Sequence, residues 1–199
     1  MADDEWPAEW QPMIDAVGQD FGGGIVYEAA DDVEKALVRR YLEPLEFDCP
    51  LHYDEEVARR YGYRGIVAPY SGMSTWIADA KWKPGTVAFA SAERGALPPS
   101  AGLGRYPMPG DQEPPRLPRP TTEYSFVTET EVDYIRAVIV GDRLSQTGCK
   151  LLSCIPKETR VGRGAFFTTE VEVQNQRGEL VARMRQQLYC YNRHPKAAE

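Results

Sequence analysis

The chain has 199 residues, a formal net charge of −7 and an isoelectric point near 5.0. This acidic balance disfavours binding to nucleic acid or anionic membranes, although it allows a local basic pocket for a phosphorylated ligand. No apolar run approaches the roughly 18 to 20 residues of a membrane-spanning helix. The start MADDEWPAEW has no secretory-signal pattern, so we expect a cytoplasmic protein.

The metal-binding residue types are few. Four cysteines, at positions 49, 149, 154 and 190, show no CxxC spacing, and we expect them to be reduced. The two histidines lie far apart in the sequence, which argues against zinc ligation. We therefore predict no metal site.

The N-terminal third predicts two helices and a strand. Trp6, Trp10, Met13, Ile14 and Val17 recur at the spacing of a short amphipathic helix. The Gly22–Gly24 run lacks the lysine of a phosphate loop and predicts a turn into a strand over residues 25–27. A second helix, with Asp31 or Asp32 as its N-cap, should end at Pro44.

The segment from Phe47 to Trp76 is dense in features of a functional site. His52 can exchange a proton near neutral pH, and Asp48 can orient it if residues 48–51 form a tight turn. Such a pair can perform general acid and base catalysis. The alternative is a structural histidine whose ring hydrogen-bonds a backbone carbonyl. After it, Asp54 as N-cap and Gly62 past the C-terminus predict a helix of about two turns.

A buried helix is predicted from Ser71 to Ala80, because Pro69 ends the preceding extended run and apolar residues then recur at helical spacing. The backbone N–H groups around Tyr70, Ser71 and Gly72 would lie at its start. There they suit a carbonyl oxygen that gains negative charge. An aromatic residue such as Tyr70 at a helix entry is at least as often a packing residue.

The stretch from Trp82 to Pro120 is rich in proline and glycine and predicts an ordered but irregular excursion. It is either a lid or wall of a substrate tunnel or an arm between subunits. From Thr122 the hydrophobic period becomes two, and four long strands with hairpin turns follow. Helices followed by antiparallel strands indicate the α+β class, with the helices on one face of the sheet.

Two motifs resemble the MaoC-like dehydratases, and more narrowly their N-terminal-type domain, which is related to fungal fatty-acid synthase dehydratases. They are Pro50-Leu51-His52 followed by Ala58 after five intervening residues, and the run from Gly62 to Pro69, GYRGIVAP. With later matches such as Val138–Asp142, the resemblance extends from about residue 32 to residue 191, without the excursion. It implies a hot-dog fold, in which an antiparallel sheet wraps around a central helix, here expected at residues 71–80.

The absence of an internal repeat predicts one hot-dog domain over residues 1–199, with residues 1–24 as an N-terminal arm and residues 82–120 as an excursion within it. The family acts on 2-enoyl and 3-hydroxyacyl thioesters, usually of coenzyme A. The resemblance assigns His52 to its catalytic histidine. The aspartate and asparagine positions of the motif hold Phe47 and Cys49, so the carboxylate is displaced by one residue to Asp48. The oxyanion-hole glycine aligns near Tyr70.

We therefore expect an enoyl-CoA hydratase or 3-hydroxyacyl-CoA dehydratase. His52 would be the base, Asp48 its orienting partner or the acid, and the N–H groups from Tyr70 to Gly72 the enolate donors. The basic residues Lys157, Arg160 and Arg163 would bind the coenzyme A phosphates, or would only keep a hairpin soluble. Coenzyme A enters as part of the substrate, and the reaction requires no other cofactor.

Two other functions stay open. In many N-terminal-type domains the site has degenerated, so the chain is alternatively a non-catalytic acyl-binding subunit of a heteromeric dehydratase. A hot-dog thioesterase would need a carboxylate near the central helix, for which Glu34, Glu43 and Asp79 are weak candidates. A single hot-dog sheet has an open edge and a shallow half-site, so we expect a homodimer or a heteromer with a second hot-dog subunit.

Overall fold

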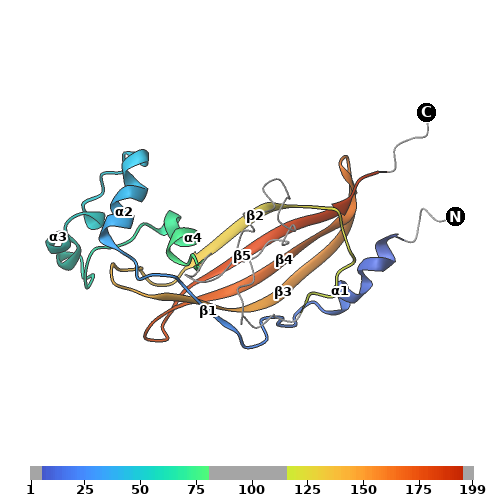
Figure 1. The fold of residues 1–199 in the computed structure, drawn as a ribbon, viewed down its shortest axis with the longest axis horizontal. Helices are drawn as coiled ribbons and strands as arrows, with labels where there is room; N and C mark the ends of the chain where they lie inside the picture. Colours follow the sequence, from blue (N-terminus) through green and yellow to red (C-terminus); the bar gives the residue numbers. More distant parts are fainter. Residues whose placement is uncertain (1–5, 81–115, 195–199) are drawn as a thin grey trace, which may run out of the picture.

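The computed structural model describes residues 6–80 and 116–194 and is built on a five-stranded antiparallel sheet (Figure 1). The strands lie in the order β1-β3-β4-β5-β2. Their bounds are Val26–Glu28 (β1), Tyr124–Tyr134 (β2), Leu144–Thr159 (β3), Gly162–Asn175 (β4) and Leu180–Asn192 (β5). The α-helices are short: Gln11–Asp15 (α1), Lys35–Leu42 (α2), Glu55–Arg60 (α3) and Met73–Trp76 (α4). The α+β class is confirmed.

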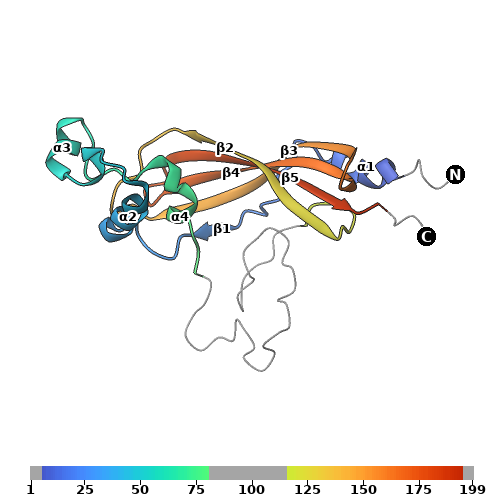
Figure 2. The same ribbon diagram turned by 90° about the horizontal axis from the view of Figure 1, so that it is seen from above.

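The helices lie at the two ends of the sheet (Figures 1 and 2). Helices α2, α3 and α4 gather at one end and α1 at the other. Each end has a core. The first joins α2 and α4 to the sheet through Val38, Leu42, Met73, Trp76, Leu144, Val173, Val181 and Ala182. The second joins α1 to the sheet through Trp10, Met13, Leu151, Phe167, Leu188 and Cys190. On β4 the core residues of both ends are odd-numbered, and their partners on β5, Ala182, Leu188 and Cys190, are even-numbered, so both cores lie on one face. Val181 lies at the register shift beside Ala182.

The predicted alternation is confirmed in β5 from Ala182 to Cys190, but not at Leu180, which lies beyond a register shift, and not in β2. A β-bulge between Val127 and Glu129 shifts the β2–β5 register by one residue. Because side chains alternate between faces, this shift moves the apolar set from one face to the other. Phe126 therefore contacts Tyr189 on one face of the sheet, while Val132 packs against the helical core on the other. The prediction of one continuous apolar face along this strand was wrong.

Local signals set the bounds of α3. The Asp54 carboxylate accepts hydrogen bonds from the amides of Glu56 (2.8 Å) and Val57 (3.1 Å), as an N-cap does. At the other end Gly62 has a φ of 86°. This left-handed conformation closes the helix, and both predicted ends are confirmed. In α2, by contrast, the N-cap is Glu34 without a side-chain hydrogen bond, so the predicted cap at Asp31 or Asp32 was wrong.

The predicted helix from Ser71 to Ala80 is much shorter than expected. A 3-10 turn, Tyr70–Gly72, leads into α4, which ends at Trp76. The next residues bond elsewhere, since the Ala78 carbonyl accepts from the amide of Ala30 (2.9 Å). This tertiary contact uses a carbonyl that the continuing helix would need, so propensity alone did not set the helix end.

Other predictions have mixed outcomes. The N-terminal helical segment is confirmed over residues 6–15, with Trp10 and Met13 buried, although Val17 is exposed. All four cysteines are free, as expected. Most of the predicted excursion lies in residues 81–115, outside the described residues. Within residues 6–80 and 116–194, no helix is long and apolar enough to cross a membrane.

Candidate functional site

His52 lies on a tight turn between α2 and α3. The residues Pro50–His52 form one 3-10 turn, in which the His52 amide donates to the Cys49 carbonyl (3.1 Å). The Asp54 amide then donates to the Pro50 carbonyl (2.9 Å), so the turn leads directly into the capped α3. The turn lies over residues 50–52 and not over residues 48–51, where it was predicted. The His52 side chain is half-buried.

The His52 ring is fixed by a backbone carbonyl 15 residues away. Its Nδ1 lies 2.6 Å from the Val67 oxygen. A carbonyl oxygen can only accept, so Nδ1 carries a proton. In the neutral ring Nε2 therefore has the free lone pair and can accept a proton. The carbonyl contact expected of a structural histidine is thus present, and it also prepares the other nitrogen for proton transfer.

Asp48 does not occupy the orienting position. Its carboxylate is exposed, and it makes no hydrogen bond or ion pair within residues 6–80 and 116–194. His52 Nδ1 contacts the Val67 carbonyl instead. Phe47, which stands at the family's aspartate position, places its ring 5.5 Å from the His52 ring and is half exposed. The orienting role that we predicted for Asp48 therefore belongs to a backbone group.

The Tyr70–Gly72 turn supplies fewer donors than predicted. The Gly72 amide donates to the Pro69 carbonyl (3.1 Å), so this N–H is already used within the turn. Gly72 itself is required by packing, because a Cβ there would lie 2.4 Å from the Trp76 ring. Tyr70 is exposed, and its carbonyl accepts from the Tyr134 hydroxyl (2.9 Å). The role of Tyr70 and Ser71 as donors to a ligand stays a prediction.

The basic residues Lys157, Arg160 and Arg163 lie at the other end of the sheet. They surround the β3–β4 hairpin, whereas Val67, the partner of His52, bridges to Ile139, close to the start of β3. The 16 residues of β3 separate these ends by roughly 50 Å. A ligand pocket is far smaller than that, so in one chain these groups do not line a single site.

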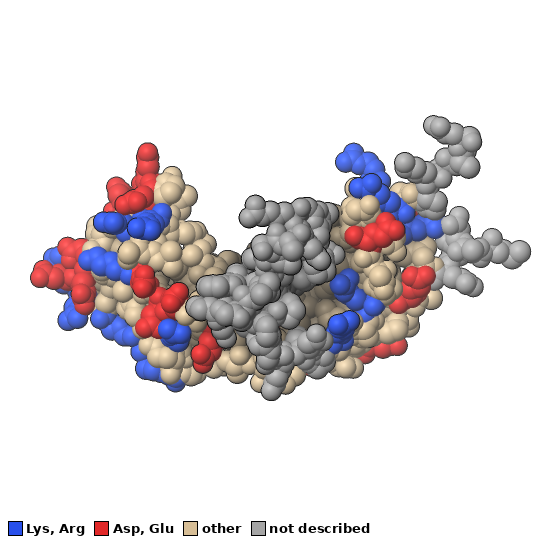
Figure 3. Space-filling view, in the orientation of Figure 1, with Lys and Arg blue, Asp and Glu red and all other residues tan. Residues whose placement is uncertain are grey.

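The charge around this hairpin is mixed. Arg163 lies 3.3 Å from Glu158, which also lies 3.5 Å from His194. Figure 3 shows both signs of charge at each end of the molecule. The structure therefore supports a hairpin with internal ion pairs, and coenzyme A binding there stays a prediction.

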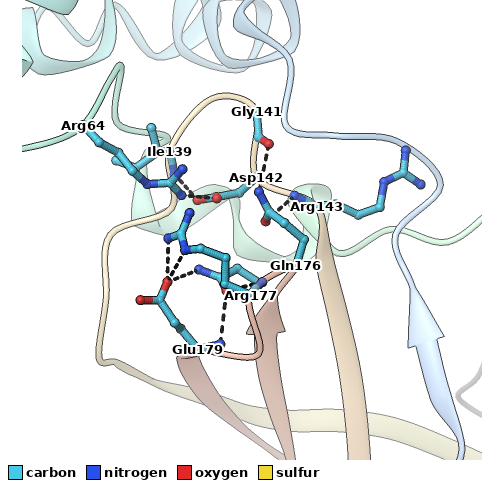
Figure 4. Close-up of polar contacts among 9 residues, drawn as sticks. Arg64, Ile139, Gly141, Asp142, Arg143, Gln176, Arg177 and Glu179 are labelled. Carbon is cyan, nitrogen blue, oxygen red and sulfur yellow. Dashed lines mark hydrogen bonds and ion pairs between the residues drawn. The ribbon is translucent and has the colours of Figure 1, made fainter.

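Sequence reasoning missed an ion pair close to the His52 turn (Figure 4). Arg64 donates to the carboxylate of Asp142, whose side chain is fully buried. The same carboxylate accepts from the Ile139 amide (2.8 Å). The two charged residues are 78 positions apart, so no local pattern could pair them. The available signal was an arginine and an aspartate that each fall within a family-like motif.

Sequence comparison identifies relatives of this chain. A family model described as "FAS1-like, dehydratase domain region" matches residues 16–95. A curated protein of Thermomonospora curvata, named "Probable enoyl-CoA hydratase alpha subunit", is 32% identical over 171 residues, which are 85% of this chain and 47% of the relative. The chain thus spans about half the length of that relative.

Structural comparison identifies the fold. The ChsH1–ChsH2 complex of Mycobacterium tuberculosis contains a chain that superposes with a TM-score of 0.60 at 19% identity, over 98% of this chain and 96% of that one. A MaoC-like dehydratase from Rhodospirillum rubrum superposes with a TM-score of 0.50 at 22% identity, over 86% and 93% of the two chains. The chain has the hot-dog fold.

Proposed function

We propose that this chain is a subunit of an enoyl-thioester hydratase in which His52 is the general base. The observation that carries the proposal is the 2.6 Å contact between His52 Nδ1 and the Val67 carbonyl. It leaves Nε2 as the proton acceptor of a half-buried ring on a rigid turn. The name of the Thermomonospora curvata relative supports the same reaction class.

The reaction needs few groups. Nε2 of His52 takes a proton from water while the water oxygen bonds to C3 of the enoyl group, and the displaced electron pair moves to the thioester oxygen. The imidazolium then returns the proton to C2, which regenerates the neutral ring and completes the addition of water. Backbone donors at Tyr70 and Ser71 would stabilise the enolate oxygen. Asp48, exposed on the same loop, is the alternative donor of the C2 proton; in that case the imidazolium releases its proton to water, and Asp48 takes one up from water.

A second hot-dog subunit would complete the site. His52 has no carboxylate partner in the described part of the chain, and the predicted coenzyme A residues lie at the far end of the sheet. The word "subunit" in the name of the curated relative, and the fact that the structural relative is a complex, support this assembly. We propose that the substrate is a coenzyme A thioester.

The test is the loss of enoyl absorbance when trans-2-enoyl-CoA is added to the chain alone and with a second hot-dog subunit. His52→Ala should lower kcat by about 100-fold or more, because a positioned base typically contributes 10²–10⁴-fold. His194→Ala is the matched control, since it removes the chain's other histidine at the opposite end of the sheet and should leave kcat unchanged. Release of free thiol would indicate a thioesterase instead.

One observation favours a second candidate, a supporting subunit that binds the acyl group while its partner performs the chemistry. The carboxylate of the family motif is displaced, and Asp48 contacts neither His52 nor another residue within the described ranges. In that case, the assembled complex should hydrate the substrate at the same rate with His52→Ala as with the unchanged chain. That result would remove His52 from the mechanism.

A further inference from the structure

The carbonyl that fixes His52 belongs to an extended segment, Ile66–Ala68, held between two parts of the chain. On one side the Val67 amide donates to the Leu51 carbonyl (3.0 Å) and the Val67 carbonyl faces His52 Nδ1. On the other side the Ala68 amide donates to Val138 (2.8 Å), and Ile66 accepts from Val140 (2.9 Å). The position of the Val67 carbonyl therefore depends on the register between residues 66–68 and 138–140.

The ion pair between Arg64 and Asp142 holds the two segments in this register, because each segment has one of the two residues beside it. Arg64 lies two residues before Ile66, where the 66–68 segment begins, and its guanidinium contacts the Asp142 carboxylate. Asp142 lies two residues after Val140, where the 138–140 segment ends. Its carboxylate also accepts from the amide of Ile139, the residue that bridges Val67. Its own amide returns to the Ile139 carbonyl (2.8 Å). Figure 4 shows the Arg64 and Ile139 contacts meeting at this one carboxylate.

The burial of the Asp142 carboxylate favours one register of the two segments over the others. The Asp142 side chain is fully buried while the Arg64 side chain is 43% exposed. A buried carboxylate is costly unless it is paired and hydrogen-bonded. A shift of one residue between the two segments would separate Arg64 from Asp142 and leave the carboxylate uncompensated, so that shift is strongly disfavoured.

We propose that Arg64 and Asp142 are positioning residues for His52, acting through the Val67 carbonyl to hold the ring in its Nδ1–H tautomer. The predicted effect on catalysis rests on the proposed function, in which His52 is the base. The predicted effect on the tautomer of the His52 ring does not depend on catalysis. An error of about 1 Å in the position of a catalytic group can cost on the order of 100-fold in rate.

The experiment is nitrogen-15 NMR of the histidine rings above their titration range, with activity measured in parallel. The chain has two histidines, so each signal is assigned by removing one, and His194 is an internal reference. The unchanged chain should show His52 with the proton on Nδ1. Arg64→Gln and Asp142→Asn should each convert part of the population to the Nε2–H tautomer and lower kcat about 10- to 100-fold, with little change in KM.

Two further variants test the pairing. Arg64→Lys keeps the positive charge, so it should fold even where Arg64→Gln does not. It loses the planar guanidinium that binds a carboxylate through two N–H groups, so part of the population should change tautomer. The double variant should shift it no further than either single change, because both act through one contact. Arg143→Gln is the control. Arg143 is next to Asp142, but its ion pair with Asp32 lies on the surface, so the tautomer should not change.

The outcomes separate the two claims. An unchanged His52 tautomer in folded Arg64→Gln, Arg64→Lys and Asp142→Asn overturns the positioning role, whatever the activity. A shift in Arg143→Gln of the same size overturns it as well, because any disturbance of the loop would then suffice. A tautomer that changes as expected in a chain for which His52→Ala leaves activity intact supports the positioning role and overturns the proposed function.

Discussion

At the scale of single residues, Asp20 shows how one carboxylate connects two segments. Its Oδ1 accepts from the amides of Gly22 (2.6 Å) and Cys149 (2.9 Å), which joins the N-terminal segment to β3. These two hydrogen bonds favour the charged form and lower the pKa of Asp20 below its usual value, despite some desolvation. The carboxylate therefore stabilises the fold when it is ionised.

The resulting prediction concerns acid stability. Because the folded state has the lower pKa, the unfolded state binds more protons as the pH falls below about 5. The contribution of Asp20 is therefore complete above the unfolded pKa and is lost as the pH falls through the folded pKa. Asp20→Asn should unfold at lower urea concentration at pH 7 but lose less stability between pH 6 and pH 3. Asp48→Asn, which removes a carboxylate without a hydrogen bond or ion pair in the described part of the chain, should follow the unchanged chain.

Gly72 carries a second residue-scale prediction. An added Cβ would overlap the ring of Trp76, which is buried and donates its Nε1–H to the Pro69 carbonyl (2.9 Å). We expect Gly72→Ala to destabilise the chain by about 1–3 kcal/mol, the usual cost of overpacking. Urea unfolding followed by circular dichroism measures it. Ser74→Ala, an exposed neighbour in α4, should change stability by less than about 0.5 kcal/mol, and an equal loss in both would contradict the steric argument.

His52 itself shows what a single sequence reveals of a site. Its place before a helix was predicted from neighbouring residues, whereas its turn was predicted over residues 48–51 and lies over residues 50–52. Its tautomer was not predicted, because this depends on a carbonyl 15 residues away, and any residue type can supply a carbonyl. Asp48 was predicted as the partner of His52 because its side chain is a carboxylate close by in the sequence. A backbone carbonyl cannot be identified in this way, because every residue has one.

At the scale of elements, α3 depends on its cap. Asp54→Ala removes the acceptor for the amides of Glu56 and Val57, and should cost about 1 kcal/mol of stability. Asp54→Asn should retain most of it, because the amide oxygen still accepts. Asp48→Ala removes a carboxylate six residues earlier that has no hydrogen bond within the described residues, and should cost little. Urea titrations of the three variants decide it, and equal losses for Asp54→Ala and Asp48→Ala would exclude the cap.

The contrast between α3 and α4 explains which elements the sequence could predict. Both ends of α3 are set by residues within the helix or next to it, so their types identify them. The end of α4 depends on Ala78 bonding to Ala30, 48 positions away along the chain. The bulge in β2 is likewise set by pairing with β5. Residue types therefore predict the helix ends that are set by neighbouring residues. They do not predict helix ends or strand registers that are set by contacts between distant segments.

At the scale of the whole molecule, the sheet has two unequal edges. β1 has three residues, whereas β2 has eleven and presents exposed apolar side chains, including Phe126 and Val127. A long unprotected edge strand favours pairing with another chain. The sequence predicted the need for a partner from the family's half-site. It could not say which edge is available, because the strand order is a property of the assembled sheet.

The edge that meets the second subunit is therefore predicted to be β2. Val127→Lys places a charge on this edge at a side chain that is 41% exposed, and should weaken association by at least about 10-fold in Kd, or about 1.4 kcal/mol. Val26→Lys makes the same change on β1, where the side chain is 57% exposed, and should leave the Kd unchanged. Analytical ultracentrifugation across a concentration series measures both, for self-association and with a second hot-dog subunit. Equal effects of the two lysines would show that charge alone is responsible, and weakening only by Val26→Lys would move the interface to the opposite edge.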